Sequence, residues 1–309
     1  MPRFPEQIAR TMLSRFGIDP AGDLQPWPFP EQSSDLLARF RSGEKHYLLK
    51  RRIIEQRGER SLFETQFIQK ELLKKGIPVP ELWEAPNGET LLSGPDWEED
   101  RKIYFEIQEE VPGGAFVLNE GTAHQAGQFL GRFHQAGAQI DTFLLNKGYW
   151  IKDFTSRRYA GVNRLREHLH QHQSLSERET RIIGETIERA YSFSRISSRT
   201  WGLYHGDMCA NNLLSTGEQC FLVDLDEMGI GEVWGDIFSL MSEVPEFNPA
   251  IIRSLVKGYR DGGGTLNEDD LLAITDTLVL GRFGKAINDS DTTFNASEWF
   301  ENLQFIMDL

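Results

Sequence analysis

The sequence predicts an α+β protein with two lobes: a small N-terminal lobe built on an antiparallel sheet and a larger, mainly helical C-terminal lobe. Short runs of alternating apolar and polar residues, separated by turn residues, are concentrated before residue 111. Pro112-Gly113-Gly114 then interrupts the chain, and amphipathic helical patterns dominate after it. We therefore expect lobes at 1–111 and 112–309, and the chain is long enough for two packed cores.

The elements of the first lobe follow from local patterns. A helix is expected near the N-terminus, ending near Gly17, and QPWPFP at 25–30 is too rich in proline for a helix. The remaining expected elements are a hairpin of 36–41 and 46–51, a helix at 61–75, a hairpin at 83–94 around an Asn-Gly turn, and a strand at 103–111.

The helix at 61–75 has an apolar stripe. Its members are Phe63, Phe67, Leu72 and Leu73. Gly76 ends the helix before Ile77-Pro78.

The second lobe is expected to be helical because its apolar residues recur at helical spacing. A capping box at 176–179 marks the start of one of these helices. The expected helices are 122–136, 176–192 and three near 234–243, 248–260 and 267–284.

The most informative segment reads HGDMCANNLL, at residues 205–214. Asn212 follows Asp207 by five residues, and Asp224 follows Asp207 by seventeen. A strand at 201–204 leads into the segment, and a strand–turn–strand pattern follows it to Val223. The polar residues are therefore expected in a loop and at strand ends, where chemistry is commonly supported by a rigid scaffold.

These residue types suit phosphoryl transfer. Asp207 can accept a proton from a hydroxyl group. Asn212 and Asp224 supply the hard oxygen ligands that Mg²⁺ prefers when it bridges nucleotide phosphates.

The segment resembles the catalytic core of the aminoglycoside phosphotransferase/choline kinase family, which are small-molecule kinases with a protein-kinase-like fold. The resemblance implies that Asp207 is the catalytic base and that Asn212 and Asp224 bind Mg²⁺. It also implies that Asp236, twelve residues after Asp224, steadies the catalytic loop and that His205 is structural or orients this loop.

The resemblance further implies a lysine on a strand that holds the α- and β-phosphates. Lys50 is our candidate, although it could instead be part of a solvated basic strand end with its arginine neighbours. Glu64 is the expected ion-pair partner of Lys50. Two alternatives stay open: Glu64 could complete a capping box with Ser61, and Glu71 lies two turns further along nearly the same face.

The rest of the nucleotide site is less marked in the sequence. No glycine-rich loop is present at 31–35, so the candidates for phosphate contacts are backbone amides and the hydroxyl of Ser33 or Ser34. The nucleotide base is expected to lie against the last part of the strand, near Glu109 and Val111, and to form hydrogen bonds with the backbone there. Either ATP or GTP fits this description.

Composition limits the classes of partner. A net charge of -14 argues against nucleic acid and is compatible with a cationic substrate, although it also simply favours solubility. No apolar run is long enough to span a membrane. Cys209 and Cys220 are interpreted as reduced thiols, which predicts a cytoplasmic protein. The oligomeric state stays open.

Three conspicuous features are interpreted as structural. Gly262-Gly263-Gly264 is expected to connect two helices, because no strand precedes it and no lysine follows it. His134 is expected to be a core histidine with its hydrogen bonds satisfied, and Cys209 is expected only to fill space in the loop.

The sequence therefore predicts an ATP-dependent phosphotransferase that uses Mg²⁺ and a small-molecule hydroxyl acceptor, which could be an aminoglycoside, choline-like, homoserine-like or sugar molecule. The alternatives are a catalytically silent nucleotide-binding module and a protein Ser/Thr kinase, although only twelve residues separate Asp224 from Asp236, too few for an activation segment. Residues that could contact the acceptor are Tyr149, Trp150, Asp153, Arg157, Arg158, Glu232 and Glu243.

Overall fold

The computed structural model of residues 1–309 forms two compact units. The N-terminal unit contains residues 1–114 and 214–225, and the C-terminal unit contains 115–213 and 226–309. The strand–turn–strand segment that follows the HGD motif thus belongs with the first lobe rather than the second. The structure describes residues 6–19, 24–26, 36–53, 59–94, 103–141, 176–192, 200–244 and 248–288. Each unit is considered by itself.

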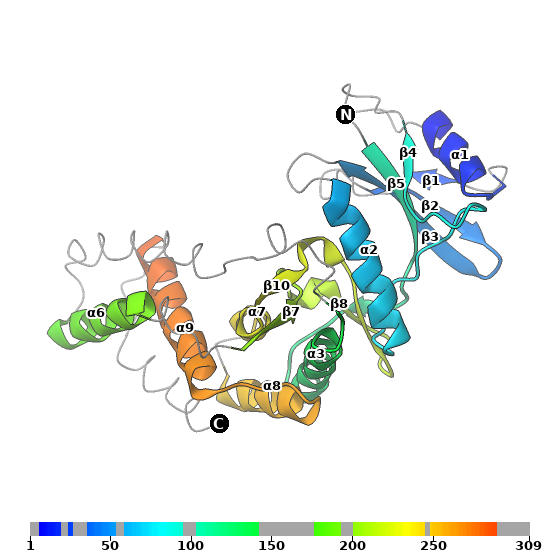
Figure 1. Ribbon diagram of the computed structural model, residues 1–309. Helices are drawn as coiled ribbons and strands as arrows, with labels where there is room; N and C mark the ends of the chain where they lie inside the picture. Colours follow the sequence, from blue (N-terminus) through cyan, green and yellow to red (C-terminus); the bar gives the residue numbers. More distant parts are fainter. Residues whose placement is uncertain are drawn as a thin grey trace. The chain divides into compact units, whose positions relative to one another are not determined.

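The N-terminal unit is built on a five-stranded antiparallel sheet with the strand order β1-β2-β3-β5-β4 (Figure 1). Its strands are β1 Gln25–Pro26, β2 Leu36–Ser42, β3 Lys45–Ile53, β4 Leu92–Gly94 and β5 Ile103–Glu109.

The expected hairpin of 36–41 and 46–51 is confirmed, since β2 and β3 pair around a tight turn. The hairpin expected at 83–94 is wrong. A turn forms at its centre, but β4 pairs with β5, and residue 82 makes only an isolated bridge to β5.

One face of this sheet carries the apolar core. Helix α1, Glu6–Arg15, places Met12 and Leu13 in the same buried cluster as Leu49, Phe105 and Ile107 of the central strands. These residues alternate along β3 and β5, as expected for strands with one apolar face. Helices α1 and α2 lie on opposite sides of the sheet (Figure 1).

Helix α2, Glu59–Lys74, packs on the other face with an unexpectedly polar surface. Of the apolar stripe, Phe63 and Phe67 are 48% and 37% exposed, and Phe63 packs edge-on against the ring of Tyr104 in β5. The helix instead buries Gln66 and Gln69 beside Ile68 and Leu72. The reason is that this face of the sheet is itself polar: Gln66 Nε2 donates to a carboxylate of β5 at 2.7 Å.

A second hairpin lies between the HGD motif and α7. Strands β8, Leu213–Ser215, and β9, Cys220–Leu222, are joined by the predicted turn and continue a small sheet with β6, Gly114–Ala115, in the order β6-β8-β9. Within the N-terminal unit, the amide of Leu222 donates to the carbonyl of Pro78 at 2.9 Å, which attaches the hairpin to the segment after α2.

The C-terminal unit is mainly helical, as predicted. Its helices are α3 Ala123–Gly137, α6 Glu177–Ser192, α7 Trp234–Ser242, α8 Pro249–Asp261 and α9 Glu268–Asn288. Each matches an expected helix to within a few residues. Strands β7, Trp201–Tyr204, and β10, Gly229–Glu232, form a two-stranded sheet.

Helices α3 and α8 lie side by side and make the most extensive helix contact in the described part of the chain (Figure 1). Glycines of both helices lie in this contact, so the two backbones approach closely: a Cβ atom at Gly131 would lie only 2.1 Å from the carbonyl oxygen of Tyr259. Among the helices of the described residues, none combines the length and the apolar character that crossing a membrane requires.

Candidate active site

The catalytic loop, defined here as residues 205–212, follows β7 directly. Its last turn, Ala210–Asn212, is a 3-10 helix that leads into β8. Asp207 is exposed, whereas Asn212 is 9% exposed. Asn212 Nδ2 donates to the backbone oxygen of Asp207 at 2.8 Å and approaches its carboxylate Oδ2 at 3.2 Å. The structure therefore brings together two of the predicted catalytic residues.

This arrangement leaves specific atoms available for chemistry. Because the amide nitrogen of Asn212 points toward Asp207, its oxygen Oδ1 is left to accept or to ligate. The second carboxylate oxygen of Asp207 is not used by another described side chain. An exposed carboxylate and a neutral amide oxygen thus lie close together on one short loop.

Asp236, in the first turn of α7, fixes the start of the catalytic loop. Its Oδ2 accepts the amide of His205 at 2.7 Å, and its Oδ1 accepts the amide of Gly206 at 3.0 Å. Gly206 has φ of +84°, and a Cβ atom there would lie 2.4 Å from the carbonyl of Glu227, so only glycine fits. The sharp backbone path places Asp207 at the exposed end of the loop.

The surroundings of Asp236 favour the ionised form of its carboxylate. Burial alone would raise the pKa of Asp236, but the hydrogen bond from His134 and the charges and amides around it hold the pKa below its ordinary value. An ionised Asp236 accepts hydrogen bonds only, which suits a group that holds two backbone amides.

Cys209 does not have the properties of a nucleophile. Burial raises the pKa of its thiol, and the nearby carboxylates of Asp207 and Glu243 raise it further. A thiol of this kind stays protonated near neutral pH, so covalent catalysis by Cys209 has no electrostatic support.

Asp224 has an unusual backbone conformation. It is exposed and has φ of +58°, the one positive φ of a non-glycine residue in the described ranges. This left-handed conformation costs roughly 1 kcal/mol or more, and such residues cluster at functional sites. Asp224 belongs to the N-terminal unit, whereas Asp207 and Asn212 belong to the C-terminal unit. That the three residues share one site stays a prediction.

The expected ligand set suits Mg²⁺ and would not suit a fully protein-bound metal. Within the described ranges, no group of three or more His, Cys, Asp or Glu side chains is arranged to hold a metal ion. Mg²⁺ commonly takes only one or two carboxylate or amide oxygens from the protein and completes its shell with phosphate and water. The available Oδ1 of Asn212 and the exposed carboxylate of Asp224 fit this pattern.

Lys50 lies on the polar face of the N-terminal sheet, half-buried, opposite Glu106 in the β3–β5 ladder. Among the described residues its side chain has no hydrogen bond or ion pair, so no ion pair with Glu64 is formed here. Glu64 itself is buried, on the side of α2 that faces the sheet. The predicted contacts of Lys50 with phosphate and of Glu64 with Lys50 stay predictions.

A buried network that the sequence did not reveal surrounds Lys50. Glu106 accepts from Arg52 and Gln108 at 2.8 Å each and from Gln66 at 2.7 Å. Alternation along the strands could have shown that residues 50, 52, 106 and 108 share a face of the sheet. It could not have shown that Glu106 forms its ion pair with Arg52. The partners of the expected core histidine His134, described below, could not be predicted for the same reason: they are far away in sequence.

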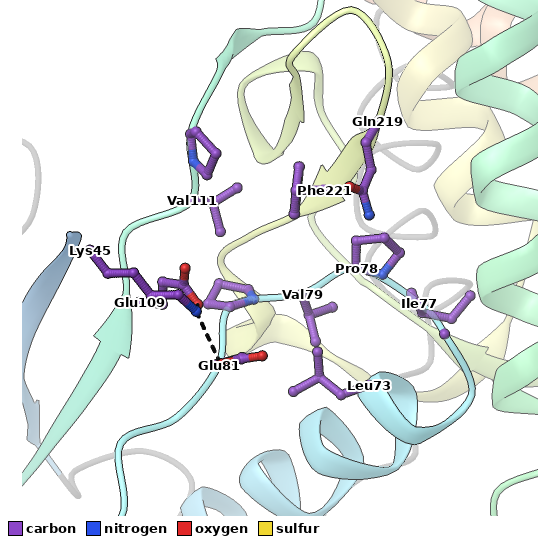
Figure 2. Close-up of a pocket in the computed structure, with 13 residues that line it drawn as sticks. Lys45, Leu73, Ile77, Pro78, Val79, Glu81, Glu109, Val111, Gln219 and Phe221 are labelled. Atoms are coloured by element: carbon purple, nitrogen blue, oxygen red, sulfur yellow. Dashed lines mark hydrogen bonds and ion pairs between the residues drawn. The ribbon is translucent and has the colours of Figure 1, made fainter. Parts of the chain in front are cut away.

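A pocket of about 380 Å³ lies in the N-terminal unit beside two of the predicted nucleotide-binding residues (Figure 2). Glu109 and Val111 line it together with Val79, Phe221 and Lys45, and Lys45 forms an ion pair with Glu109 at 2.9 Å. Lys50, Glu64 and the catalytic loop do not line this pocket. The side chains of Glu109 and Val111 therefore face this pocket. The backbone amide of Glu109 already donates to the carbonyl of Glu81 at 2.8 Å, so binding of the base to the backbone of this strand stays a prediction.

Several predicted site residues lie outside the described residues. They are Ser33, Ser34, Tyr149, Trp150, Asp153, Arg157 and Arg158. Of the other two candidates for acceptor contacts, Glu232 is buried and accepts from Trp234 Nε1 at 3.0 Å, which indicates a structural role. Glu243 is exposed and accepts the amide of Ala210 at 2.8 Å, three residues after Asp207 in the loop.

Comparison with known proteins agrees with this geometry. The sequence profile described as the phosphotransferase enzyme family matches residues 28–269. The chain belongs to this family. The aminoglycoside phosphotransferase/choline kinase resemblance is thereby confirmed, and the chain is a phosphotransferase enzyme. Comparison with curated proteins gives no significant match.

Solved structures of small-molecule kinases are similar over nearly the whole chain. Amicoumacin kinase hAmiN, in complex with AMP-PNP, Ca²⁺ and Ami, has 17% identity and a TM-score of 0.65 over 99% of this chain and 94% of that one. Spectinomycin phosphotransferase APH(9)-Ia, in complex with ADP and spectinomycin, has 16% identity and a TM-score of 0.60 over 100% and 98%.

A microcompartment-associated aminopropanol kinase has 15% identity and a TM-score of 0.60, over 98% of this chain and 95% of that one. At such identities the likeness concerns the fold. It confirms the predicted fold class, α+β with the two-lobed protein-kinase-like architecture of the phosphotransferase family.

Proposed function

We propose that this phosphotransferase moves the γ-phosphate of ATP to a hydroxyl group of a small molecule with the help of Mg²⁺. The observation that carries the proposal is the catalytic loop: an exposed carboxylate, Asp207, is held by the amide of Asn212 on a backbone fixed by Asp236. Solved structures of the same fold that contain AMP-PNP or ADP support the choice of an adenine nucleotide.

Asp207 would orient the acceptor hydroxyl and accept its proton as the bond to phosphorus forms. Positioning of this kind, together with charge stabilisation, accounts for most catalysis of phosphoryl transfer. Asn212 and Asp224 would hold Mg²⁺, which supplies neutralisation of phosphate charge when it is bound. Lys50 would contact the phosphates, with Glu64 orienting it and Ser33 and Ser34 as further contacts.

The acceptor is proposed to be a small molecule with a positive charge. Glu243 places a second carboxylate beside the loop that carries Asp207, because it accepts the amide of Ala210. Two exposed carboxylates near the transfer site favour a cationic acceptor such as an amino alcohol. Similar folds act on spectinomycin and aminopropanol, which agrees with acceptors of this size.

A protein substrate is less well supported. The stretch between Asp224 and Asp236 is filled by a 3-10 turn at Leu225–Glu227 and by β10 before α7 begins. It therefore has no long loop that could bind a peptide. A silent nucleotide-binding module is also disfavoured, since Asp207, Asn212 and Asp224 are all present.

The proposal is tested by a screen of amino alcohols, aminoglycosides and sugars, with ADP release as the readout and Mg²⁺ present. Asp207→Asn should lower kcat by about 10²-fold or more with an unchanged KM for ATP. Asp261→Asn, an exposed carboxylate on α8, is the matched control and should leave turnover unchanged. Near-normal turnover in Asp207→Asn would reject the assignment, and ATP binding without turnover on any acceptor would favour the silent module.

A further inference from the structure

Three buried polar side chains form a continuous chain that ends at the catalytic loop. Tyr259 Oη lies 2.8 Å from His134 Nδ1, and His134 Nε2 lies 3.0 Å from Asp236 Oδ2. Asp236 in turn accepts the amides of His205 and Gly206. Helices α3 and α8, which contribute no residue to the loop, are therefore connected to it by hydrogen bonds.

Because these three side chains are buried, loss of one of their hydrogen bonds is costly. Tyr259 and Asp236 are each 1% exposed, and His134 is 6% exposed. A buried polar group that loses its partner is penalised because water cannot replace the bond. The expected core histidine is confirmed, but both of its ring nitrogens are used, one on each side. His134 thus connects two groups rather than only filling space.

The direction of hydrogen bonding follows from the charge state of Asp236. As an ionised carboxylate it only accepts, so His134 must carry a proton on Nε2. In a neutral imidazole Nδ1 is then an acceptor, and the hydroxyl of Tyr259 donates to it. Donation therefore runs from Tyr259 to His134 to Asp236: Asp236 sets the tautomer of His134, and the hydroxyl of Tyr259 supplies the donor that Nδ1 then needs.

Close helix packing sets the place of Tyr259. The backbones of α3 and α8 come together at their glycines, and the carbonyl of Tyr259 lies directly against Gly131. His134 lies one turn further along α3 from Gly131. The hydroxyl of Tyr259 and the ring of His134 are therefore brought together by two rigid helices.

We propose that Tyr259 and His134 are positioning residues for phosphoryl transfer. Tyr259 holds the Nε2-protonated tautomer of His134, and His134 holds the carboxylate of Asp236 in the place where it fixes the backbone that leads to Asp207. The inference rests on the proposed function, in which Asp207 is the catalytic carboxylate. A displacement of about 1 Å of a reacting group can lower a rate by about 10²-fold.

The decisive pair of variants is His134→Leu and His134→Gln. Leucine removes the donor to Asp236, whereas the amide nitrogen of glutamine can occupy the place of Nε2 and restore it. We expect His134→Leu to lower kcat by about 10-fold or more, with the KM for ATP within about 2-fold of the unchanged enzyme. His134→Gln should recover most of kcat. Tyr259→Phe should lower kcat by a smaller factor, about 2- to 5-fold, because Nδ1 of His134 then loses its buried hydrogen-bond partner while Nε2 still donates to Asp236.

A second readout separates this inference from the proposed reaction. Amide hydrogen exchange of the peptide that contains His205 and Gly206 should be faster in His134→Leu than in His134→Gln. This measurement needs no substrate. If exchange changes as expected while no acceptor is phosphorylated, the proposed function fails and the positioning network stands.

The inference is overturned by equal kcat in the leucine and glutamine variants, measured well below their melting temperatures. Unchanged exchange at the catalytic loop would also overturn it. A loss that appears only in the KM for ATP contradicts it as well, because loop positioning acts on the transfer step. If His134→Leu does not fold, the proposal is tested on Tyr259→Phe and His134→Gln instead. Each is compared with the unchanged enzyme in kcat and in amide hydrogen exchange of the catalytic loop.

Discussion

Glu106 lies directly opposite Lys50 across the β3–β5 ladder, yet its carboxylate is hydrogen-bonded to other residues. Arg52 and Gln108 donate to Oε1, and Gln66 donates to Oε2. Opposing residues in an antiparallel pair project from the same face of the sheet, so the acid and the lysine are neighbours. Glu106 thus connects β3, β5 and α2, and within the described part of the chain no side chain pairs with the ammonium group of Lys50.

This arrangement predicts that Glu106 acts on stability. Glu106→Gln removes the negative charge that pairs with the buried guanidinium of Arg52, and breaking a buried pair on one side typically costs about 3–5 kcal/mol. Urea denaturation should show a loss of this size in the free energy of unfolding. Glu109→Gln breaks the exposed pair with Lys45 and should lose less than about 1 kcal/mol. Equal losses in the two variants would contradict the structural role of Glu106.

Lys50 is predicted to act on nucleotide binding and not on stability. Lys50→Met removes a charge that has no partner among the described residues, so the free energy of unfolding should change by less than about 1 kcal/mol. The KM for ATP should rise by about 10-fold or more, because a contact to phosphate is lost. Steady-state kinetics at varied ATP measures this, and Lys70→Met on the exposed side of α2 serves as the control.

The same measurement on Glu64→Gln decides between the two roles considered for this residue. A raised KM for ATP would indicate that Glu64 orients Lys50 in the working enzyme. A loss of stability with an unchanged KM would indicate a role in capping α2. An unchanged KM in Lys50→Met would exclude Lys50 as the phosphate-binding lysine.

The parts of the site that could be predicted are those that are local in sequence. Asp207 and Asn212 lie five residues apart, and the strands and turn around them have clear signals, so their contact follows from the loop itself. The helices of the second lobe were predicted well for the same reason, because apolar periodicity is a property of one segment.

What could not be predicted depends on pairs that are distant in sequence. His134 meets Asp236 over 102 residues and Tyr259 over 125 residues. The polar buried face of α2 was missed because periodicity assigns apolar residues to the interior, whereas Gln66 is required inside by Glu106 on the sheet. Since Gln66 takes a buried position on α2, Phe63 of the same helix is left half-exposed.

The buried hydroxyl of Tyr259 predicts a loss of stability in alkaline solution. Burial raises the pKa of Tyr259 above its ordinary value, so the folded state holds this proton more tightly than the unfolded state does. The stabilisation is fully present below about pH 10 and is lost as the pH rises above it, with a slope of up to about 1.4 kcal/mol per pH unit. Urea denaturation between about pH 9 and pH 11 should show a steeper decline for the unchanged enzyme than for Tyr259→Phe. Parallel curves would mean that the hydroxyl titrates normally.

Two glycine-to-alanine substitutions in helices should have opposite effects on stability. At Gly131 in α3, a Cβ atom would lie 2.1 Å from the carbonyl of Tyr259, so α8 must move and the free energy of unfolding should fall by about 1–3 kcal/mol. At Gly281 in α9, such a Cβ would meet no atom of another described element within 4 Å, and alanine should add about 0.5–1 kcal/mol by favouring the helix.

The glycine pair also probes the link between helix packing and catalysis. Because displacement of α8 moves the Tyr259 hydroxyl away from His134, Gly131→Ala should lower kcat as well as stability, whereas Gly281→Ala should change stability alone. Thermal denaturation and turnover of ATP, measured on the same samples at a temperature where all remain folded, check both effects. Full turnover in Gly131→Ala would show that the contact of α3 with α8 stabilises the lobe without positioning the loop.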